Sequence, residues 1–554
     1  MNSSNRERIP SRTDTACAGT PRLARFLHLG VWSLVVLIGH AWFLNSGFTN
    51  LEFAFAGAAR HFSGVVGDGQ EMERYFAHQA NPLGYSLVAA IGFSIVGHGT
   101  SFWSVRIPSL AGALLILVAG WLWCANDAQR RRVFPVWSAA IATNPLVWCY
   151  SGQATADILP TGLVMFAFSL CVTAKLRFPP HIVAATLVAL ACLVKYNAIL
   201  LLPMFLSTVL LESRDSLFSR RNLAILAVYS GLTLAILGIY GTWLYGTFGI
   251  FMVPEHFRRV YQQSTASNSH VNVFLCYLAY LAMVCGFFSA ILPIANGRRI
   301  VAGLKALPQA VRSGKLPHLV GDRTVQHGTA TIAATSCLLI GLYGMLNVTD
   351  GEMDQGGFDH LFPSYVFTIA KSLGLFLAIY AAVIWAFHAW RTRKPFSTAT
   401  LIGIAVYLVA SSLTRPAQRY LLLILPLVMW QIVVICSRVR SPWKTLAQAT
   451  GIGLFGALSL VGSTYLASQG DAADRLARWI VRENLATVTA PGAISFHASQ
   501  YFPVSIPNNP RYVVITGESP QALRAESMWF AGQRFRTYSL VPTRSLEATP
   551  RHDH

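Results

Sequence analysis

Long apolar runs recur along almost the whole chain, and they constrain its fold more than any other feature. Many are about 18–25 residues long, which is the length a helix needs to cross a hydrocarbon core roughly 30 Å thick. In lipid, every backbone polar group must be satisfied within the protein, so such runs must be helices. Only 12% of the residues are charged, against about 25% in soluble proteins. The sequence therefore predicts an all-α polytopic membrane protein.

The basic charge of the chain fits a membrane better than a nucleic acid. The net charge is +20, but the positive residues fall in short loops between apolar runs, where they set orientation. No nucleic-acid motif accompanies them, so no nucleic-acid partner is expected. The nine cysteines show neither a disulfide framework nor metal-ligand spacing. No cofactor is evident, although one or two carboxylates could hold a divalent cation.

The distribution of Lys and Arg predicts the topology. We place residues 1–25 in the cytoplasm as a basic tail, followed by an uncleaved first helix. The later basic loops then lie on the cytoplasmic side only if residues 82–97 do not cross the membrane. We therefore expect 82–97 to be an in-plane helix within a first outside loop, 47–104. About thirteen spans are predicted, by the length and polarity of the apolar runs, at 26–44, 105–124, 133–150, 157–174, a short pair within 182–211, 222–245, 273–295, 329–347, 365–389, 396–413, 420–436 and 449–468.

The chain is predicted to end outside the membrane domain, 26–468. Residues 469–554 are mostly polar and indicate a small soluble segment. Within it, 511–516 and 528–538 could be strands or helices. The outside loop 347–364 is acidic, as this orientation requires. We expect a bacterial inner membrane, with the outside face in the periplasm.

Ionisable residues collect on the predicted outside face. Such groups are costly in or beside a membrane and are functional candidates. Glu52 and Asp157 are the candidate acids. The candidate substrate-binding residues are Arg60, His78, Asn81, Lys195, Tyr196, His256, Arg258, Lys371 and Arg419. Together with an in-plane apolar helix, they suggest a substrate with its tail in lipid and an anionic head at the surface.

Simpler roles stay open for several of these residues. Asp157 could cap its helix, a role that Asp favours. Lys195 and Lys371 could extend their ammonium groups to the lipid head groups. Arg258 could bind anionic lipid heads, and Glu52 could be a solvated loop residue.

The order of short motifs along residues 26–440 resembles a known family. The motifs are Leu51–Arg60, Tyr75–Tyr85 with Pro82, Arg106-Ile107-Pro108-Ser109, Asp157, Leu193–Asn197, Glu255–Arg259 and Arg419–Leu422. This order resembles the GT-C class of membrane glycosyltransferases, and most closely glycosyltransferase family 39. That family covers protein O-mannosyltransferases and the aminoarabinose transferase of lipid A.

The resemblance implies an enzyme with a polyprenyl-phosphate-sugar donor and a single inverting displacement at the outside face. The acceptor would be a lipid, a surface glycan or a protein. A carboxylate must take the acceptor proton, and cations must stabilise the leaving phosphate. We expect Arg60, Lys195, Arg258 and Arg419, with Lys371, to supply the positive charge.

The chain departs from the family at two positions. Leu51 stands in place of the first family acid, and Asn81 in place of a basic residue before the proline. The base must therefore be Glu52, Asp157 or a nearby acid such as Asp68. Two alternatives stay open: a transporter or flippase of lipid-linked glycans, and a GT-C-like protein that has lost activity and acts as a binding partner.

Overall fold

The structure is a computed structural model of the chain. It describes residues 22–41, 44, 46–48, 52–64, 69, 71–96, 102–124, 128–174, 177–213, 219–267, 270–285, 287–312, 322–346, 364–392, 394–413, 417–439, 443–483, 485, 488–489, 511–516, 518–530 and 533–543. Asp68, Arg415 and most of the acidic loop 347–364 lie outside this range.

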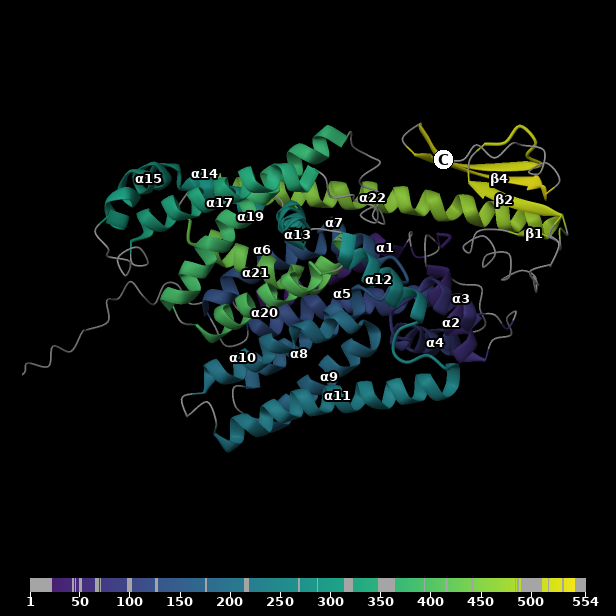
Figure 1. Cartoon of the computed structure of the whole chain (residues 1–554), viewed down its shortest axis with the longest axis horizontal. Helices are drawn as coiled ribbons and strands as arrows, with labels where there is room; N and C mark the ends of the chain where they lie inside the picture. The colour runs from purple at the N-terminus through teal and green to yellow at the C-terminus, as the bar shows by residue number, and fades with distance from the viewer. Residues whose placement is uncertain are drawn as a thin grey trace, which may run out of the picture.

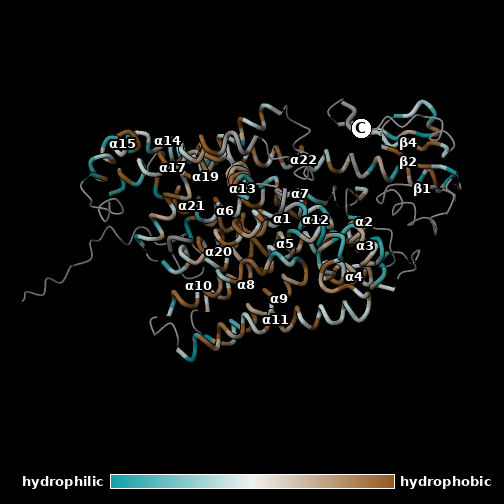
Figure 2. The backbone as a smooth tube through the Cα atoms, in the orientation of Figure 1, coloured by the Kyte–Doolittle hydropathy of each residue, from teal (hydrophilic) through white to brown (hydrophobic). Residues whose placement is uncertain are grey.

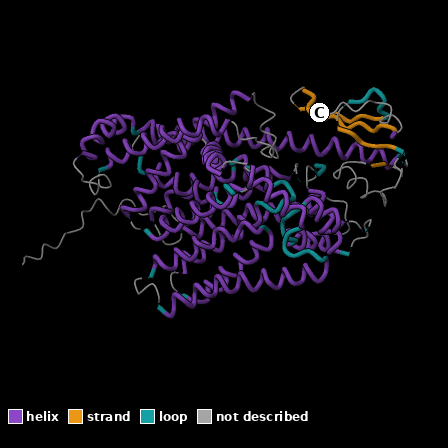
Figure 3. Tube along the Cα trace, viewed as in Figure 1, coloured by secondary structure: helices purple, strands orange, loops and turns teal. Residues whose placement is uncertain are grey.

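Helices dominate the described chain and form one bundle (Figures 1 and 3). In the first half they are α1 (Arg22–Ala41), α2 (Glu52–Ser63), α3 (Glu71–His78), α4 (Gly84–Val96), α5 (Phe102–Trp123), α6 (Ala128–Ala142), α7 (Pro145–Ser151), α8 (Ile158–Ala174), α9 (Phe178–Val194), α10 (Leu202–Glu212), α11 (Arg220–Phe248) and α12 (Glu255–Ser267). In the second half they are α13 (His270–Cys285), α14 (Phe287–Ala295), α15 (Gly297–Arg312), α17 (Arg323–Leu346), α19 (Ser364–Thr392), α20 (Pro395–Ser411), α21 (Leu425–Ser437) and α22 (Trp443–Arg482). Two 3₁₀ helices, η2 (Tyr196–Leu201) and η4 (Gln418–Leu423), precede α10 and α21.

The chain is a helical multi-pass membrane protein. Five described helices are long and apolar enough to cross a membrane, or six if α13 and α14, bent by 92°, count as one span. Six shorter apolar helices accompany them. Hydrophobic residues fill the middle of the bundle, and hydrophilic residues gather toward its ends (Figure 2). The predicted count of about thirteen spans is not confirmed, because several predicted spans are broken into shorter helices.

The breaks have a local cause. The predicted span 133–150 divides at Asn144, whose side chain caps α7 by accepting from the N–H groups of Leu146 and Val147. Pro145 begins the new helix, a position where its missing N–H does no harm. The predicted break in 182–211 lies where expected, after Val194.

Helices α2, α3 and α4 lie together at one end of the bundle (Figure 1). They share a buried cluster that includes Phe55, Tyr75 and Tyr85. The opposite side of α4 exposes Leu87, Ile91 and Ile95. With 13 residues, α4 is about 20 Å long, shorter than a hydrocarbon core of roughly 30 Å. These features favour an in-plane helix, whose position in a membrane stays a prediction.

The C-terminal segment, for which strands and helices both stayed open, forms a sheet beside the all-α membrane domain. The strands are β1 (Val488–Thr489), β2 (Tyr512–Thr516), β3 (Arg524–Phe530) and β4 (Gln533–Pro542), in the order β1-β2-β4-β3. β1 pairs with β2 in parallel, and β4 pairs with β2 and β3 antiparallel. Both stretches that were left open as strand or helix lie in this sheet. Its inner side packs on the last turns of α22, which continues past residue 468 to Arg482.

Candidate functional site

A buried ion pair joins the start of α8 to the end of α9. Asp157 directly precedes α8, and Lys195 directly follows α9. Asp157 Oδ1 accepts a hydrogen bond from Lys195 Nζ, and the two side chains are 7% and 4% exposed. Among the described residues, no donor reaches the second oxygen, Oδ2. Burying two charges carries a large desolvation cost. The buried pair is therefore a candidate functional site.

Two broken helices present the cations of this site. Lys195 has an extended backbone, with φ −151° and ψ 116°. The chain then continues as η2, and α10 follows with Pro203 in its first turn. The same order recurs at η4, which contains Arg419 and Tyr420 and is followed by α21 with Pro426 in its first turn. Each break therefore supplies a basic residue followed by a tyrosine.

The two breaks meet in the interior. Lys195 Nζ lies 4.7 Å from the ring centroid of Tyr420, and the Arg419 guanidinium carbon lies 5.7 Å from the same centroid. A cation within about 6 Å of an aromatic face is attracted by the ring. Two cations and one carboxylate thus share one site, with an excess of positive charge.

The loop between α11 and α12 contacts this site. The Tyr196 hydroxyl donates to the Met252 carbonyl oxygen at 2.7 Å. Met252 has φ 63°, which is uncommon for a residue other than glycine. Such strain is typical of functional sites held by their surroundings. The loop also contains Gly249, at φ 69°, which ends α11.

An apolar groove runs from the α9 break between α9 and α11. Its volume is about 280 Å³, and its lining residues are Leu193, Ile236, Ile239, Tyr240 and Trp243. Ile239 and Trp243 are 71% and 40% exposed. Tyr240 hydrogen-bonds Tyr196 and accepts from the Leu83 N–H at 3.0 Å. The groove therefore opens on the outer surface of the bundle, and its lining residue Tyr240 hydrogen-bonds to Tyr196, the residue after Lys195.

Glu52 occupies a different position from Asp157. It begins α2, is 1% exposed, and receives Arg106 Nε and Nη2 at 2.9 Å each. The Ala154 N–H donates to Glu52 Oε1 at 2.6 Å. Arg106 also donates to the carbonyl oxygens of Leu44, Ser46 and Gly47. Together these contacts link α2, α5, the segment that follows α1 and the loop that carries Asp157.

The remaining predicted site residues lie in varied surroundings. Arg60 is buried in α2. Lys371 is buried in α19, with Nζ 5.5 Å from the ring centroid of Tyr280. Asn81 donates through Nδ2 to Gln79 Oε1 at 3.1 Å. His256 and Arg258 are exposed on α12.

The first-loop helices contain two groups with shifted pKa values. Partial burial, and then Arg74 and His256, lower the pKa of His78. Burial raises the pKa of Tyr75 well above its ordinary value. The Tyr75 hydroxyl donates to the carbonyl oxygens of Asn81 and Pro82, which fixes the turn into α4.

Sequence reasoning missed two residues of this site. Arg106 and Tyr420 were noted in motifs but were not named as site residues. An arginine at the start of an apolar run is a usable signal, because it needs a buried partner. No group of three or more His, Cys, Asp or Glu that could hold a metal occurs among the described residues.

No protein-family model and no curated protein matches the chain. Its structure is similar to ArnT from Cupriavidus metallidurans bound to undecaprenyl phosphate, at 13% identity, 93% coverage of this chain, 97% coverage of that chain and a TM-score of 0.43. It is also similar to the Archaeoglobus fulgidus oligosaccharyltransferase tethered with an acceptor peptide, at 13% identity and a TM-score of 0.45. That match covers 89% of this chain and 60% of the other.

A second structure from Archaeoglobus fulgidus is also similar. AglB in complex with an inhibitory peptide and a dolichol-phosphate is 12% identical, with a TM-score of 0.45. The match covers 88% of this chain and 60% of that chain. These proteins are GT-C membrane glycosyltransferases, the class that the sequence resembles. At such identities and TM-scores, the function has to be inferred from the site itself.

Proposed function

We propose that the chain is a membrane glycosyltransferase that moves a sugar from a polyprenyl-phosphate donor to an acceptor hydroxyl. The observation that carries the proposal is the meeting of two broken helices at Asp157, Lys195 and Arg419. An anionic phosphate fits the excess of positive charge there, and arginine suits phosphate through its planar fork. The groove along α9 and α11 offers an apolar surface for the polyprenyl chain beside Lys195.

The proposed reaction is a single displacement. The acceptor oxygen attacks the anomeric carbon, and the bond from that carbon to the phosphate oxygen breaks. The phosphate leaves with the bonding electrons, and Lys195 and Arg419 stabilise its charge. Asp157 Oδ2 takes the acceptor proton. The result is inversion at the anomeric carbon, on the face predicted to be periplasmic.

We assign the base to Asp157 and a structural role to Glu52. Both Glu52 oxygens already accept from Arg106, and Oε1 also accepts from Ala154. A general base must be within hydrogen-bond reach of the proton that it removes. Asp157 retains an oxygen for this purpose. The acceptor would be a lipid, a surface glycan or a protein.

The test is sugar transfer by purified protein in nanodiscs. Labelled polyprenyl-phosphate sugars are supplied with a membrane extract as acceptor. Asp157→Asn is expected to lower transfer by about 10²–10⁴-fold, the usual contribution of a general base. Glu483→Gln, an exposed acid changed in the same way, should keep native activity. Equal transfer by native protein and Asp157→Asn would reject Asp157 as the base.

The second candidate is a transporter of lipid-linked glycans, which the two broken helices favour. Discontinuous helices often form substrate sites in transporters. The discriminating measurement is movement of the labelled lipid between leaflets of liposomes without acceptor. Leaflet exchange that needs Lys195 and Arg419, in the absence of any sugar transfer, would support the transporter instead.

A further inference from the structure

A large basic cavity lies at the end of the bundle away from the proposed transfer site. Figure 1 places α14 and α15 at the left end and α2 and α3 toward the right. The cavity has a volume of about 1310 Å³ between α14, α15, α17, α19 and α21. Five arginines line it: Arg298, Arg299, Arg323, Arg391 and Arg438. Among the described lining residues there is no aspartate or glutamate, so the cavity concentrates positive charge.

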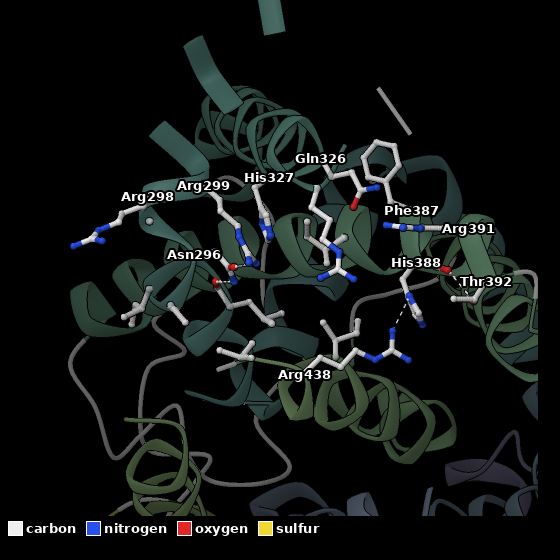
Figure 4. Close-up of a pocket in the computed structure, with 18 residues that line it drawn as sticks. Asn296, Arg298, Arg299, Gln326, His327, Phe387, His388, Arg391, Thr392 and Arg438 are labelled. Atoms are coloured by element: carbon white, nitrogen blue, oxygen red, sulfur yellow. Dashed lines mark hydrogen bonds between the residues drawn. The ribbon is translucent and has the colours of Figure 1, made fainter. Parts of the chain in front are cut away.

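Several polar side chains of the cavity are held in place by neighbours (Figure 4). Arg299 Nη1 donates to Asn296 Oδ1 at 3.0 Å, and the buried Asn296 donates to the Leu292 carbonyl oxygen at 2.8 Å. Arg438 Nη1 donates to His388 Nδ1 at 3.0 Å. The Arg299 contact uses one of several N–H donors that a guanidinium carries. The Asn296 contact thus orients an arginine that lines the cavity.

Exposed apolar residues adjoin this charge. Ile294 lines the cavity and is 73% exposed. Val301 and Val311 are exposed on α15, the same helix that carries Arg298 and Arg299. A helix with basic and apolar faces suits the membrane surface. The loop charges predict that this end is cytoplasmic, where clustered Lys and Arg attract anionic lipids.

We propose that this cavity binds the phosphate-bearing head group of an anionic membrane lipid, with its acyl chains along Ile294 and the apolar face of α15. Charge-assisted bonds from arginine to phosphate are short and often two-pronged. The cavity exceeds the roughly 300–1,000 Å³ of ordinary ligand sites, so a head group with two phosphates fits. This site is separate from the transfer site and does not depend on the function proposed for it.

The test compares lipid binding by the full-length protein and two variants with equal charge loss. Delipidated protein in neutral detergent is titrated with cardiolipin, and bound lipid is counted by native mass spectrometry. Arg299→Gln with Arg391→Gln removes two charges of the cavity. Lys305→Gln with Arg312→Gln is the matched control, because both side chains are exposed on α15 and neither lines the cavity.

The cavity variant should bind cardiolipin about tenfold more weakly or worse, as expected from losing at least one charge-assisted hydrogen bond. The control variant should match the native protein, and phosphatidylcholine should bind weakly to both. Equal affinity in both variants, or equally tight phosphatidylcholine, overturns the proposal. Inorganic pyrophosphate is the second probe. Pyrophosphate that displaces the lipid and needs Arg299 and Arg391 supports the site, whereas pyrophosphate binding without lipid binding overturns the lipid as ligand.

Discussion

At the residue scale, two buried acids of similar sequence context have different surroundings. Glu52 begins α2 and Asp157 directly precedes α8, each beside an apolar run. Arg106 contacts both oxygens of Glu52, whereas Lys195 contacts one oxygen of Asp157. The difference predicts that Glu52 affects mainly folding and that Asp157 affects mainly chemistry.

We expect Glu52→Gln to destabilise the protein by about 3–5 kcal/mol, because it leaves the Arg106 charge buried without its carboxylate. Thermal unfolding in detergent measures the loss. The double variant Glu52→Gln with Arg106→Met should lose less than the sum of the two single changes, since neighbours in one network are coupled. Strict additivity would contradict a structural ion pair.

Removing a cation from the transfer site should weaken the binding of the polyprenyl-phosphate donor. Arg419→Gln is predicted to reduce polyprenyl-phosphate affinity roughly tenfold, the value of one charge-assisted contact. Affinity is measured by titrating polyprenyl phosphate in native mass spectrometry. Arg482→Gln, at an exposed arginine of α22, serves as the control. Unchanged affinity in Arg419→Gln would place the phosphate elsewhere.

At the scale of elements, close backbone approach positions the helix that begins after Asp157. α5 and α8 cross at two glycines. A Cβ on Gly162 would lie 2.4 Å from the Gly112 carbonyl oxygen, and a Cβ on Gly112 would lie 2.6 Å from Leu159 Cα. Small residues at such crossings let helix backbones approach closely.

Gly162→Ala is therefore expected to destabilise the fold by about 1–3 kcal/mol, the usual effect of overpacking. Gly238→Ala is the matched control, because nothing lies within 4 Å of its added Cβ in α11. That change should be neutral or slightly stabilising, since alanine favours helix over glycine by about 1 kcal/mol. Unfolding midpoints measure both variants. Equal midpoints would show that the crossing tolerates a larger residue.

At the scale of the whole molecule, α22 links the bundle to the C-terminal sheet. Its 40 residues span about 60 Å, twice the thickness of a hydrocarbon core. Asp471 Oδ1 accepts from the Gly47 N–H at 3.0 Å, so the helix is tied to the segment that leads into α2. This contact places the sheet at the same end of the bundle as the first loop.

The orientation predicted from loop charge can be tested on intact cells. Gln521→Cys, in the exposed turn before β3, should react with a membrane-impermeant maleimide. Arg312→Cys, at the exposed end of α15, should react only after the cells are permeabilised. The unmodified protein measures background from its own cysteines, most of which are buried. The reverse labelling pattern would show that the orientation is opposite to the predicted one.

Local sequence patterns were sufficient to predict the class of the protein and the positions of its candidate charged residues. Apolar runs require helices in lipid, and the broken helix at Lys195 was predicted from a lysine within such a run. Both reasons are local, so they can be read along the chain. The count of spans was not obtained in this way, because a break at Asn144 leaves the apolar composition unchanged.

Which charged residues lie together depends on the packing of the helices. Lys195 and Arg419 are far apart in the chain, yet both lie against the Tyr420 ring. The same packing brings the Arg106 guanidinium to the Glu52 carboxylate. It leaves Oδ2 of Asp157 without a donor among the described residues. The pairing of charged side chains that are distant in sequence depends on how the helices cross. Composition does not contain that information. The C-terminal sheet was left undecided for the same reason, since strands depend on partners distant in sequence.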